Sequence, residues 1–589
     1  MNSATQMTKR RNAIVVMLLI FFVGIAARLV YIQAIKGPEL ADEARANRLR
    51  TYTNVAPRGD IVDINGEVMA TSAVRYHIAV NQQKVAGFIL RDDEGQVVDT
   101  GASAASDLLA PILGEDPAVL GGKMVGDSTW VYLKKSVEPT VWREIRSLGI
   151  PGIEPERVSE RLYPNGNTAG NLVGYVGKDG EPLAGVEYSF NDALTGTDGY
   201  ETVEIGRGGQ VIPTGTSDSE ASVAGDTVQL SINRDVQFVA QEALDENVSK
   251  YGAEWAGVAV IDLQTHGLVA LAESGMVDPS NPSASPASAR NTARSVSSPY
   301  EPGSTGKLLT MAAAINEGVV DEYTVVEGSS RETIDGQVIN DVMDHPNWKM
   351  TATGVLAKSS NVGTVQIGTM MSDETRYNYM RAFGFGQKVD IGLAGESAGI
   401  LTPWDTWDGR SRLTTMFGQA YAVTLVQNAA MVATIGSGGV YHAPYLVEQI
   451  THPDGTVTVP ERSEPRQVIT EDSAATLLGM MESIPQEGGT GTKAYIDGFR
   501  VAGKTGTAQT SDANGRLTQV VTNFVGVVPA DNPRFALAVV AYKPDPTLTG
   551  NIVSAPVFKE VAEFALHTYG VEPSQGEAPQ FPLLIEEDE

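Results

Sequence analysis

The stretch "YEPGSTGKLLTMAAAINEG", residues 300–318, decides the fold of the C-terminal part of the chain. A proline and a glycine interrupt the preceding structure, and an apolar run then continues to a second glycine, so the pattern predicts a helix over residues 304–317. Ser304 and Lys307 are one turn apart and share a face of that helix. A partly desolvated lysine amine can remove the proton of a nearby serine hydroxyl, and a helix N-terminus favours developing negative charge. A serine cap beside a solvent-facing lysine would give the same letters, so the pair needs further support.

Two later stretches supply that support. "AKSSNVG" contains Ser359 and Asn361, and "VAGKTGTAQT" contains Lys504, Thr505, Gly506 and Thr507. Ser-x-Asn is a weak signal because it also occurs at Ser189–Asn191 and Ser231–Asn233, whereas Lys-Thr-Gly occurs once. The second stretch alternates like a strand, along which a peptide could align as an added edge strand.

The region around these motifs alternates strands and helices. Residues 256–272 and 524–543 each show two β-rich runs across a short polar turn, which predicts antiparallel hairpins. Residues 421–435 have a helical apolar pattern. An α+β domain over residues 226–570, with helices on the faces of an antiparallel sheet, follows from this order. We expect a flexible Ser/Pro/Ala-rich loop at residues 279–299 and a disordered acidic tail at residues 571–589.

The N-terminal half is predicted to be a separate, β-rich domain over residues 34–225. "PRGDIVDINGEVMATS", residues 57–72, predicts a hairpin with an Asn-Gly turn. A Gly-rich region follows at residues 161–206. Arg58, Arg161 and Glu187 are expected to form a structural charge cluster, since charges far from a cleft more often stabilise a fold than perform chemistry.

The first residues carry a basic flank and an apolar run. Lys9, Arg10 and Arg11 precede "AIVVMLLIFFVGIAA", and Arg28 interrupts before "LVYIQ". A cleaved signal peptide has a similar pattern. We favour a membrane anchor over residues 13–33, with Arg28 reaching the interface. The basic flank then leaves residues 1–12 in the cytoplasm and the rest of the chain outside.

Composition excludes several classes of function. A chain of 589 residues with 42% hydrophobic and 20% charged residues is long enough for two or more folded units. Its net charge of −29 argues against nucleic-acid binding. The absence of cysteine removes disulfides, thiolate metal sites and cysteine nucleophiles. The six histidines lack ligand spacing, so we expect no metal and no cofactor.

The three motifs, in this order, are typical of penicillin-binding proteins and class A β-lactamases. The chain resembles the class B penicillin-binding proteins, which are monofunctional peptidoglycan D,D-transpeptidases, and most closely their septal, cell-division branch. The resemblance covers nearly the whole chain; only residues 81–160 match loosely. It implies a single transmembrane helix, an elongated β-rich pedestal domain of the dimerisation type, and a transpeptidase domain with the penicillin-binding, β-lactamase-like fold. It rests on the three motif stretches and on "RGDIVDINGEVMA", "RLYPNGNTAGNLVGYVG", "FGFGQKVDIGLAGESAGIL", "FGQAYAVTLVQ" and "FVGVVPADNP".

The resemblance also implies roles for the motif residues. Ser304 would attack the penultimate D-Ala carbonyl of a stem peptide, with Lys307 as its proton acceptor. Ser359 would relay a proton to the leaving or arriving amine. The remaining implied roles are retention of the acyl side chain by Asn361, positive potential from Lys504, carboxylate binding along Thr505, Gly506 and Thr507, and an oxyanion hole formed by the backbone N–H groups of Ser304 and Thr507.

The implied ligands are peptidoglycan stem peptides, the lipid-linked precursor polymer and β-lactam antibiotics. No E-D-x-x-F-x-x-H element occurs, so the resemblance implies no glycosyltransferase activity and a separate membrane glycan polymerase as partner, with other division proteins. Four alternatives stay open. They are an elongation-type class B protein, a β-lactamase or D,D-carboxypeptidase that hands the acyl group to water, a membrane penicillin sensor, and a division scaffold with a spent site.

Overall fold

The computed structural model describes residues 3–206, 212–215, 217–290, 293–510 and 515–585. It divides into two compact units, each assembled from separate segments of the chain. The first unit consists of Met1–Pro57, Val74–Ser159 and Gly196–Ala224, and the second of Arg58–Ala73, Glu160–Thr195 and Gly225–Glu589. The sequence predicted one boundary between residues 225 and 226, whereas two segments of the N-terminal half pack into the second unit.

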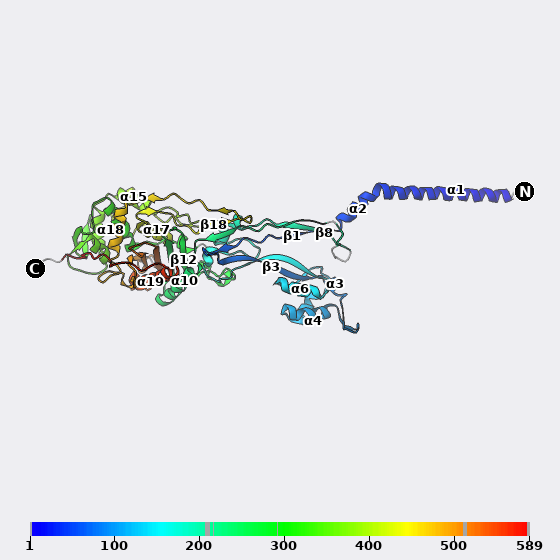
Figure 1. The fold of residues 1–589 in the computed structure, drawn as a ribbon, viewed down its shortest axis with the longest axis horizontal. Helices are drawn as coiled ribbons and strands as arrows, with labels where there is room; N and C mark the ends of the chain where they lie inside the picture. Colours follow the sequence, from blue (N-terminus) through cyan, green and yellow to red (C-terminus); the bar gives the residue numbers. More distant parts are fainter. Residues whose placement is uncertain (1–2, 207–211, 216, 291–292, 511–514, 586–589) are drawn as a thin grey trace. The chain divides into compact units, whose positions relative to one another are not determined.

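The chain begins with a long exposed helix. Helix α1 (Ser3–Val30) continues through a π-helical segment (Tyr31–Lys36) into α2 (Gly37–Ala46), labelled in Figure 1. Within the described residues it is the one helix long and apolar enough to cross a membrane, judged by length and composition. The prediction of a single apolar N-terminal helix is therefore confirmed.

The rest of the first unit combines strands with helices. Strands β1, β8 and β9 form a three-stranded sheet, β4 pairs with β5, and the last residues of β3 pair with β6. Helices α4 to α6 share a core with β3 and β6 that includes Ile78, Leu109, Leu120 and Leu133. Residues 81–160, which the sequence left without an assignment, therefore form an α/β subdomain. The elements are β1 (Leu49–Asn54), β3 (Val68–Val80), α3 (Gln82–Val85), β4 (Ile89–Arg91), β5 (Val97–Thr100), α4 (Gly101–Leu113), α5 (Pro117–Met124), β6 (Val131–Val137), α6 (Pro139–Ser147), β7 (Ile153–Leu162), β8 (Gly199–Glu204) and β9 (Ser217–Glu220).

The second unit is built around a five-stranded antiparallel sheet with the order β12-β11-β23-β22-β21. Its strands are β11 (Trp255–Asp262), β12 (Leu268–Glu273), β21 (Ala502–Thr510), β22 (Gln519–Val528) and β23 (Phe535–Tyr542). Both predicted hairpins are confirmed, as β11-β12 and β22-β23. Strands β11 and β12 are buried along their whole length, which requires cover on both faces of the sheet.

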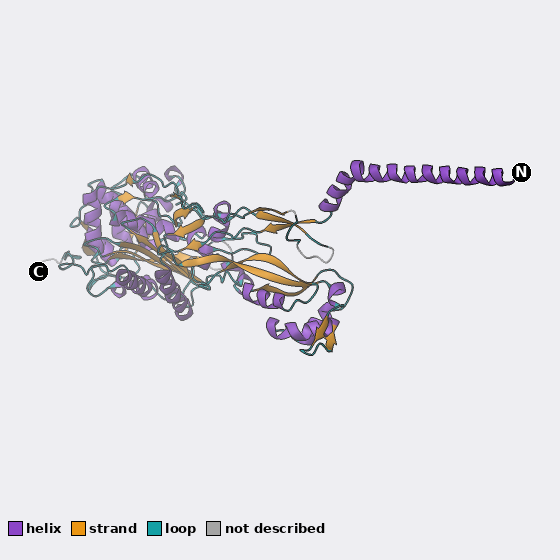
Figure 2. Ribbon diagram, turned by 45° about the vertical axis from the view of Figure 1, so that its right-hand side comes forward, coloured by secondary structure: helices purple, strands orange, loops and turns teal. Residues whose placement is uncertain are grey.

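Helices supply that cover. Helices α10 (Arg234–Tyr251) and α19 (Gly550–Thr568) pack on one face of the sheet, in a core with Phe524 and Phe558. Helix α17 (Leu425–Gly436) and the helices behind it form the larger core on the other face. Figure 2 shows these strands in orange between purple helices. The predicted α+β architecture is confirmed, and β21 lies at the end of the sheet order.

The remaining elements of the second unit surround this framework. They are β2 (Ile61–Val62), α7 (Gly170–Val173), α8 (Gly185–Ser189), α9 (Asn191–Leu194), β10 (Thr227–Leu230), α11 (Arg294–Ser297), α12 (Lys307–Asn316), β13 (Val325–Gly328), β14 (Arg331–Ile334), β15 (Gln337–Asn340), β16 (Trp348–Thr351), α13 (Ala352–Lys358), α14 (Asn361–Gly368), α15 (Asp373–Ala382), α16 (Ser411–Thr414), β17 (Val440–Tyr441), β18 (Val447–Thr451), β19 (Val457–Thr458), β20 (Arg466–Gln467) and α18 (Glu471–Met481).

Two predictions for the N-terminal half hold in the second unit. Strands β2 and β3 pair antiparallel across the predicted Asn65-Gly66 turn. Glu187 is fully buried, and its two carboxylate oxygens accept hydrogen bonds from Arg58 Nε at 2.6 Å and Arg161 Nε at 2.7 Å. The predicted charge cluster is therefore real.

Three predictions need correction. The helix predicted from residue 421 begins at Leu425, because Thr424 and Gln427 form a capping box there. The loop at residues 279–299 is not featureless: its described residues include two 3₁₀ turns and α11, where Val296 is buried.

The third correction concerns the tail, which was predicted to be disordered. Residues 571–585 lie along the second unit, where Thr351 N donates to Leu583 O at 3.2 Å and Ile585 N donates to Lys349 O at 2.8 Å. Backbone hydrogen bonds to β16 hold the tail in a defined conformation, which its acidic composition did not predict. The acidic end, residues 586–589, lies outside the described residues.

Candidate active site

Ser304 lies in a 3₁₀ turn (Gly303–Gly306) directly before α12. Gly303 has φ of 54°, and a Cβ there would lie 2.9 Å from Thr507 O, so a side chain is excluded on both grounds. The same closeness brings the backbone of Ser304 alongside β21. The Ser304 N–H belongs to the first turn, where N–H groups have no intrahelical acceptor.

The Ser304 hydroxyl meets the Lys307 amine. Lys307 Nζ lies 2.7 Å from Ser304 Oγ and also contacts Ser359 O at 2.9 Å and Ser359 Oγ at 3.2 Å. Ser359 ends α13 with φ of 59°, a left-handed conformation that costs energy for a residue with a side chain. This conformation presents both oxygens of Ser359 to the lysine. The predicted serine–lysine pair and Ser359 are therefore brought together.

A second lysine approaches Ser359 from the sheet. Lys504 Nζ donates to Ser359 Oγ at 2.9 Å and to Thr505 O at 3.0 Å. Both Lys307 and Lys504 are completely buried. Burial lowers the pKa of Lys307 to about 7, against the opposing charge of Asp341. Burial also lowers the pKa of Lys504 well below its usual value, and the charge of Lys307 adds to that effect.

The KTG residues occupy the edge strand of the sheet. Thr505 and Thr507 are two apart and therefore face the same side of β21; Thr505 is buried against Thr490, with their hydroxyl oxygens 2.9 Å apart, and Thr507 is exposed. A Cβ on Gly506 would lie 1.8 Å from Asn523 Oδ1. Only glycine therefore fits between the two threonines.

Asn361 begins helix α14. Its side chain donates to Asn340 O at 2.8 Å, and its backbone N–H donates to Asp341 Oδ1 at 2.6 Å. Within the described residues, Asn361 makes no hydrogen bond to Lys307 or Lys504, and it lies two positions after Ser359 at the start of α14.

Sequence reasoning missed two residues that hold this site. Asp341 caps α14 and raises the pKa of Lys307, and Asn523 donates to Pro302 O at 2.9 Å, two residues before the serine. Neither residue is near a motif in sequence, and neither belongs to a recognisable pattern. Asn523 could have been found from strand register alone, because pairing of β21 with β22 places it opposite Gly506.

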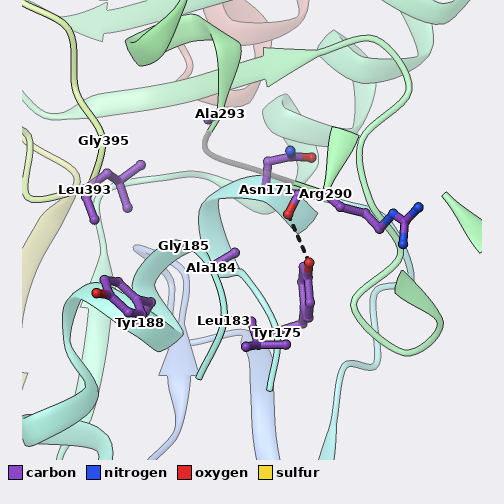
Figure 3. A pocket seen from close by; sticks show the side chains of 11 residues that line it. Asn171, Tyr175, Leu183, Ala184, Gly185, Tyr188, Arg290, Ala293, Leu393 and Gly395 are labelled. Carbon is purple, nitrogen blue, oxygen red and sulfur yellow. Dashed lines mark hydrogen bonds between the residues drawn. The ribbon is translucent and has the colours of Figure 1, made fainter. Parts of the chain in front are cut away.

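A cavity of about 500 Å³ lies elsewhere in the second unit. It is lined by the Gly-rich region and by Leu393 to Gly395, and Tyr175 donates to Arg290 O at 2.9 Å at its wall (Figure 3). None of the motif residues lines it, so it does not bear on the serine site.

Two family descriptions match the chain. "Penicillin binding protein transpeptidase domain" matches residues 256–563, and "Penicillin-binding Protein dimerisation domain" matches residues 53–230. The first match contains every motif residue described above.

Similar proteins match over nearly their whole lengths. Penicillin-binding protein PbpB of Mycolicibacterium smegmatis is 33% identical over 95% of this chain and 90% of its own. Peptidoglycan D,D-transpeptidase FtsI of Escherichia coli is 32% identical over 95% of this chain and 91% of its own.

Solved structures agree with these matches. A peptidoglycan synthetase from Bifidobacterium adolescentis has a TM-score of 0.72 and 37% identity, covering 91% of this chain and 100% of that one. Penicillin-binding protein 3 of Mycobacterium tuberculosis, in complex with aztreonam, has a TM-score of 0.69 and 26% identity with the same coverage. On this evidence the chain belongs to the penicillin-binding proteins, as a class B member of the septal type.

Proposed function

We propose that this protein cross-links peptidoglycan stem peptides through a Ser304 acyl-enzyme during septal wall synthesis. The observation that carries the proposal is the 2.7 Å contact between Lys307 Nζ and Ser304 Oγ, made by a lysine whose burial favours its neutral form. A neutral amine at that distance can take the hydroxyl proton as the oxygen attacks.

In acylation, the proton that leaves Ser304 ends on the leaving amine. Ser304 Oγ bonds to the penultimate D-Ala carbonyl carbon, and the C–N bond to the terminal D-Ala breaks. The proton passes from Oγ to Lys307 Nζ and, through Ser359 Oγ, to the leaving nitrogen. Ser359 suits this relay because its hydroxyl contacts both Lys307 and Lys504.

Transfer to the acceptor reverses these steps. The amine of a second stem peptide attacks the ester carbonyl, the bond to Ser304 Oγ breaks, and the relay returns one proton to the serine. The N–H groups of Ser304 and Thr507 would bind the oxyanion in both steps, and each such donor typically contributes about 3–4 kcal/mol to rate.

The donor peptide would lie along β21. This strand ends the sheet order, so its outer edge can accept an added peptide strand. Thr505, Gly506 and Thr507 would then contact the terminal carboxylate, with Lys504 adding positive potential. Asn361, on the opposite helix, would hold the acyl side chain.

Topology and partners extend the proposal. The basic residues before the apolar run favour a cytoplasmic N-terminus and a catalytic unit outside the membrane. The chain would depend on a membrane glycan polymerase and other division proteins, and it would bind β-lactams as substrate mimics. The FtsI and PbpB relatives support a division role over an elongation role.

The test is intact mass of the full chain in detergent, mixed with benzylpenicillin and followed for hours. We expect a lasting adduct of the full drug mass that is absent in Ser304→Ala and present in Ser283→Ala, a matched exposed serine. Rapid drug hydrolysis without an adduct would favour a β-lactamase, and an adduct in Ser304→Ala would refute the nucleophile.

A second measurement separates transfer from hydrolysis. A pentapeptide ending in D-Ala-D-Ala is incubated with a labelled D-amino acid. Exchange of the label into the peptide supports a transpeptidase, hydrolysis alone indicates a carboxypeptidase, and neither reaction, together with no penicillin adduct, would indicate a scaffold with a spent site.

A further inference from the structure

The segment between β15 and β16 carries a buried histidine–aspartate pair beside the active site. Asp341 directly follows β15, and His345 precedes Trp348, the first residue of β16. His345 Nε2 and Asp341 Oδ2 lie 2.9 Å apart, and their side chains are 3% and 6% exposed. The pair is nearly as buried as Arg161 and Glu187, which are 4% and 0% exposed.

Asp341 connects this pair to helix α14. Its Oδ1 accepts the N–H groups of Asn361 at 2.6 Å and Val362 at 2.9 Å. These are the first two residues of the helix, whose N–H groups have no intrahelical partner. The orientation of the Asp341 carboxylate therefore fixes the backbone at Asn361.

Both ring nitrogens of His345 lie beside hydrogen-bond acceptors. Nδ1 lies 2.7 Å from Pro346 O, and Nε2 meets the Asp341 carboxylate. Both neighbours accept hydrogen bonds, and the imidazolium is the form that donates from both nitrogens. The ring also stacks on Trp348, with 3.8 Å between the ring centroids, which fixes the orientation of the imidazole.

We propose that His345 is a positioning residue that orients Asp341 and offsets its negative charge, so that the catalytic lysine stays available as a base. The proposal rests on the function proposed above and deepens it. Within the described residues, His345 makes no hydrogen bond or ion pair with Ser304 or Lys307. Its effect on the reaction therefore passes through Asp341.

The electrostatics give the direction of the effect. Burial lowers the pKa of Lys307, and the charge of Asp341 raises it. Lys307 faces Ser304 in the turn before α12, Ser359 after α13, Lys504 on β21 and Asp341 after β15. Asp341 is the one anion among these groups, and its charge favours the protonated form of Lys307. The group that faces Asp341 therefore decides how strong this effect is.

The test is the pH profile of Ser304 acylation by a fluorescent penicillin, measured on the full chain between pH 5 and 9. In His345→Gln the amide still donates to Asp341 but carries no charge, so the acid limb is expected to move to higher pH by roughly 0.5–1 unit. In Asp341→Asn the cap can persist through the amide oxygen, but the anion is lost, so the limb is expected to move to lower pH.

A matched control comes from a second histidine–aspartate pair. His452 Nδ1 lies 3.0 Å from Asp226 Oδ2, outside the motif segments and with the histidine 36% exposed. His452→Gln should keep the wild-type profile. Opposite shifts in the two test variants support the proposal, and an unchanged limb in both, or shifts in the same direction, overturn it.

Misfolding of a variant and failure of the proposed function can both be told apart from failure of this proposal. If one variant does not fold, the direction of the shift in the other decides. If the wild type shows no Ser304 adduct, the proposed function fails before any profile is compared, whereas a wild-type adduct with unmoved limbs refutes the role of His345 alone.

Discussion

Gly506 and Asn523 lie opposite each other on β21 and β22, so close that a Cβ on the glycine would be 1.8 Å from Asn523 Oδ1. Asn523 Nδ2 donates to Pro302 O at 2.9 Å. The missing side chain at position 506 thus lets the asparagine reach the segment that carries Ser304. The edge strand and the nucleophile are held in register by this link.

Gly506→Ala should therefore damage the site. Asn523 is fully buried and cannot retreat, so the new methyl group must break its bond to Pro302 or shift β21. We expect at least a roughly 10-fold loss of penicillin acylation and about 1–3 kcal/mol lower stability, the usual effect of overpacking. Gly122→Ala, where a Cβ meets nothing within 4 Å, is the control. Wild-type acylation in Gly506→Ala would contradict the argument.

Acylation of the wild type should rise with pH through about 7. The neutral form of Lys307 accepts the serine proton, and burial lowers the pKa of this lysine to about 7. Below that pH the amine is protonated and cannot act as a base, so the second-order acylation rate should fall about tenfold per pH unit on the acid side. A flat rate between pH 5.5 and 8.5 would rule out Lys307 as the titrating base.

The sequence predicted the sheet hairpins and the serine–lysine turn because each is specified locally. Alternating β-rich runs define β11-β12 and β22-β23, and Lys307 follows Ser304 by three positions, which is one turn. The motif residues then meet wherever the family fold is adopted, so Ser359 and Lys504 lie in contact although they come from far-apart segments.

What could not be predicted depends on contacts between distant segments. Asp341 reaches Asn361 across 20 residues, and the tail pairs with β16 through backbone groups that leave no side-chain pattern. Residue types predicted the charge cluster at Glu187, but they did not predict that its carboxylate is buried. Residues 81–160 match the family pattern only loosely, so the resemblance did not assign their helices.

Stability should fall in mild acid because of a stacked histidine pair. The rings of His266 and His442 lie 3.5 Å apart and nearly parallel. Burial, with the neighbouring ring, lowers the pKa of His266 to about 4, and burial also lowers that of His442. A depressed histidine pKa means that the unfolded chain binds more protons below 6.5. The stabilisation present above that value is therefore lost as pH falls from 6.5 toward 4.

His266→Phe should flatten this dependence by removing the buried titrating ring. We expect a loss of on the order of 1–2 kcal/mol in the wild type across the window, after allowing for solvent screening. Denaturant unfolding at several pH values measures it. An identical slope for wild type and variant would show that the pair does not contribute.

The tail should stabilise the second unit. Thr351 Oγ1 donates to Pro582 O at 2.6 Å, and Ser574 N donates to Gly498 O at 2.9 Å. Ending the chain after residue 570 removes these bonds and should lower the melting temperature by several degrees, as roughly 1–2 kcal/mol does in a domain of this size. An unchanged melting temperature would mean that these contacts add nothing to stability.

Glu187→Gln should be among the most damaging substitutions outside the catalytic site. The carboxylate is fully buried between Arg58 and Arg161, which are 15% and 4% exposed. Neutralising it leaves two guanidinium groups without a counter-charge in the interior, a change that typically costs 3–5 kcal/mol, or about half the stability of an ordinary domain.

Glu67→Gln is the matched control, because its partner Arg234 is 3.1 Å away but the glutamate is 56% exposed. Exposed pairs contribute about 0–1 kcal/mol, so this variant should unfold close to the wild type. Denaturant midpoints of both variants, with penicillin acylation of the folded fraction, give the comparison. Equal midpoints would mean that the buried cluster is replaceable. A large loss in Glu187→Gln alone, with acylation retained where folded, would show that these charges serve the fold and not the chemistry.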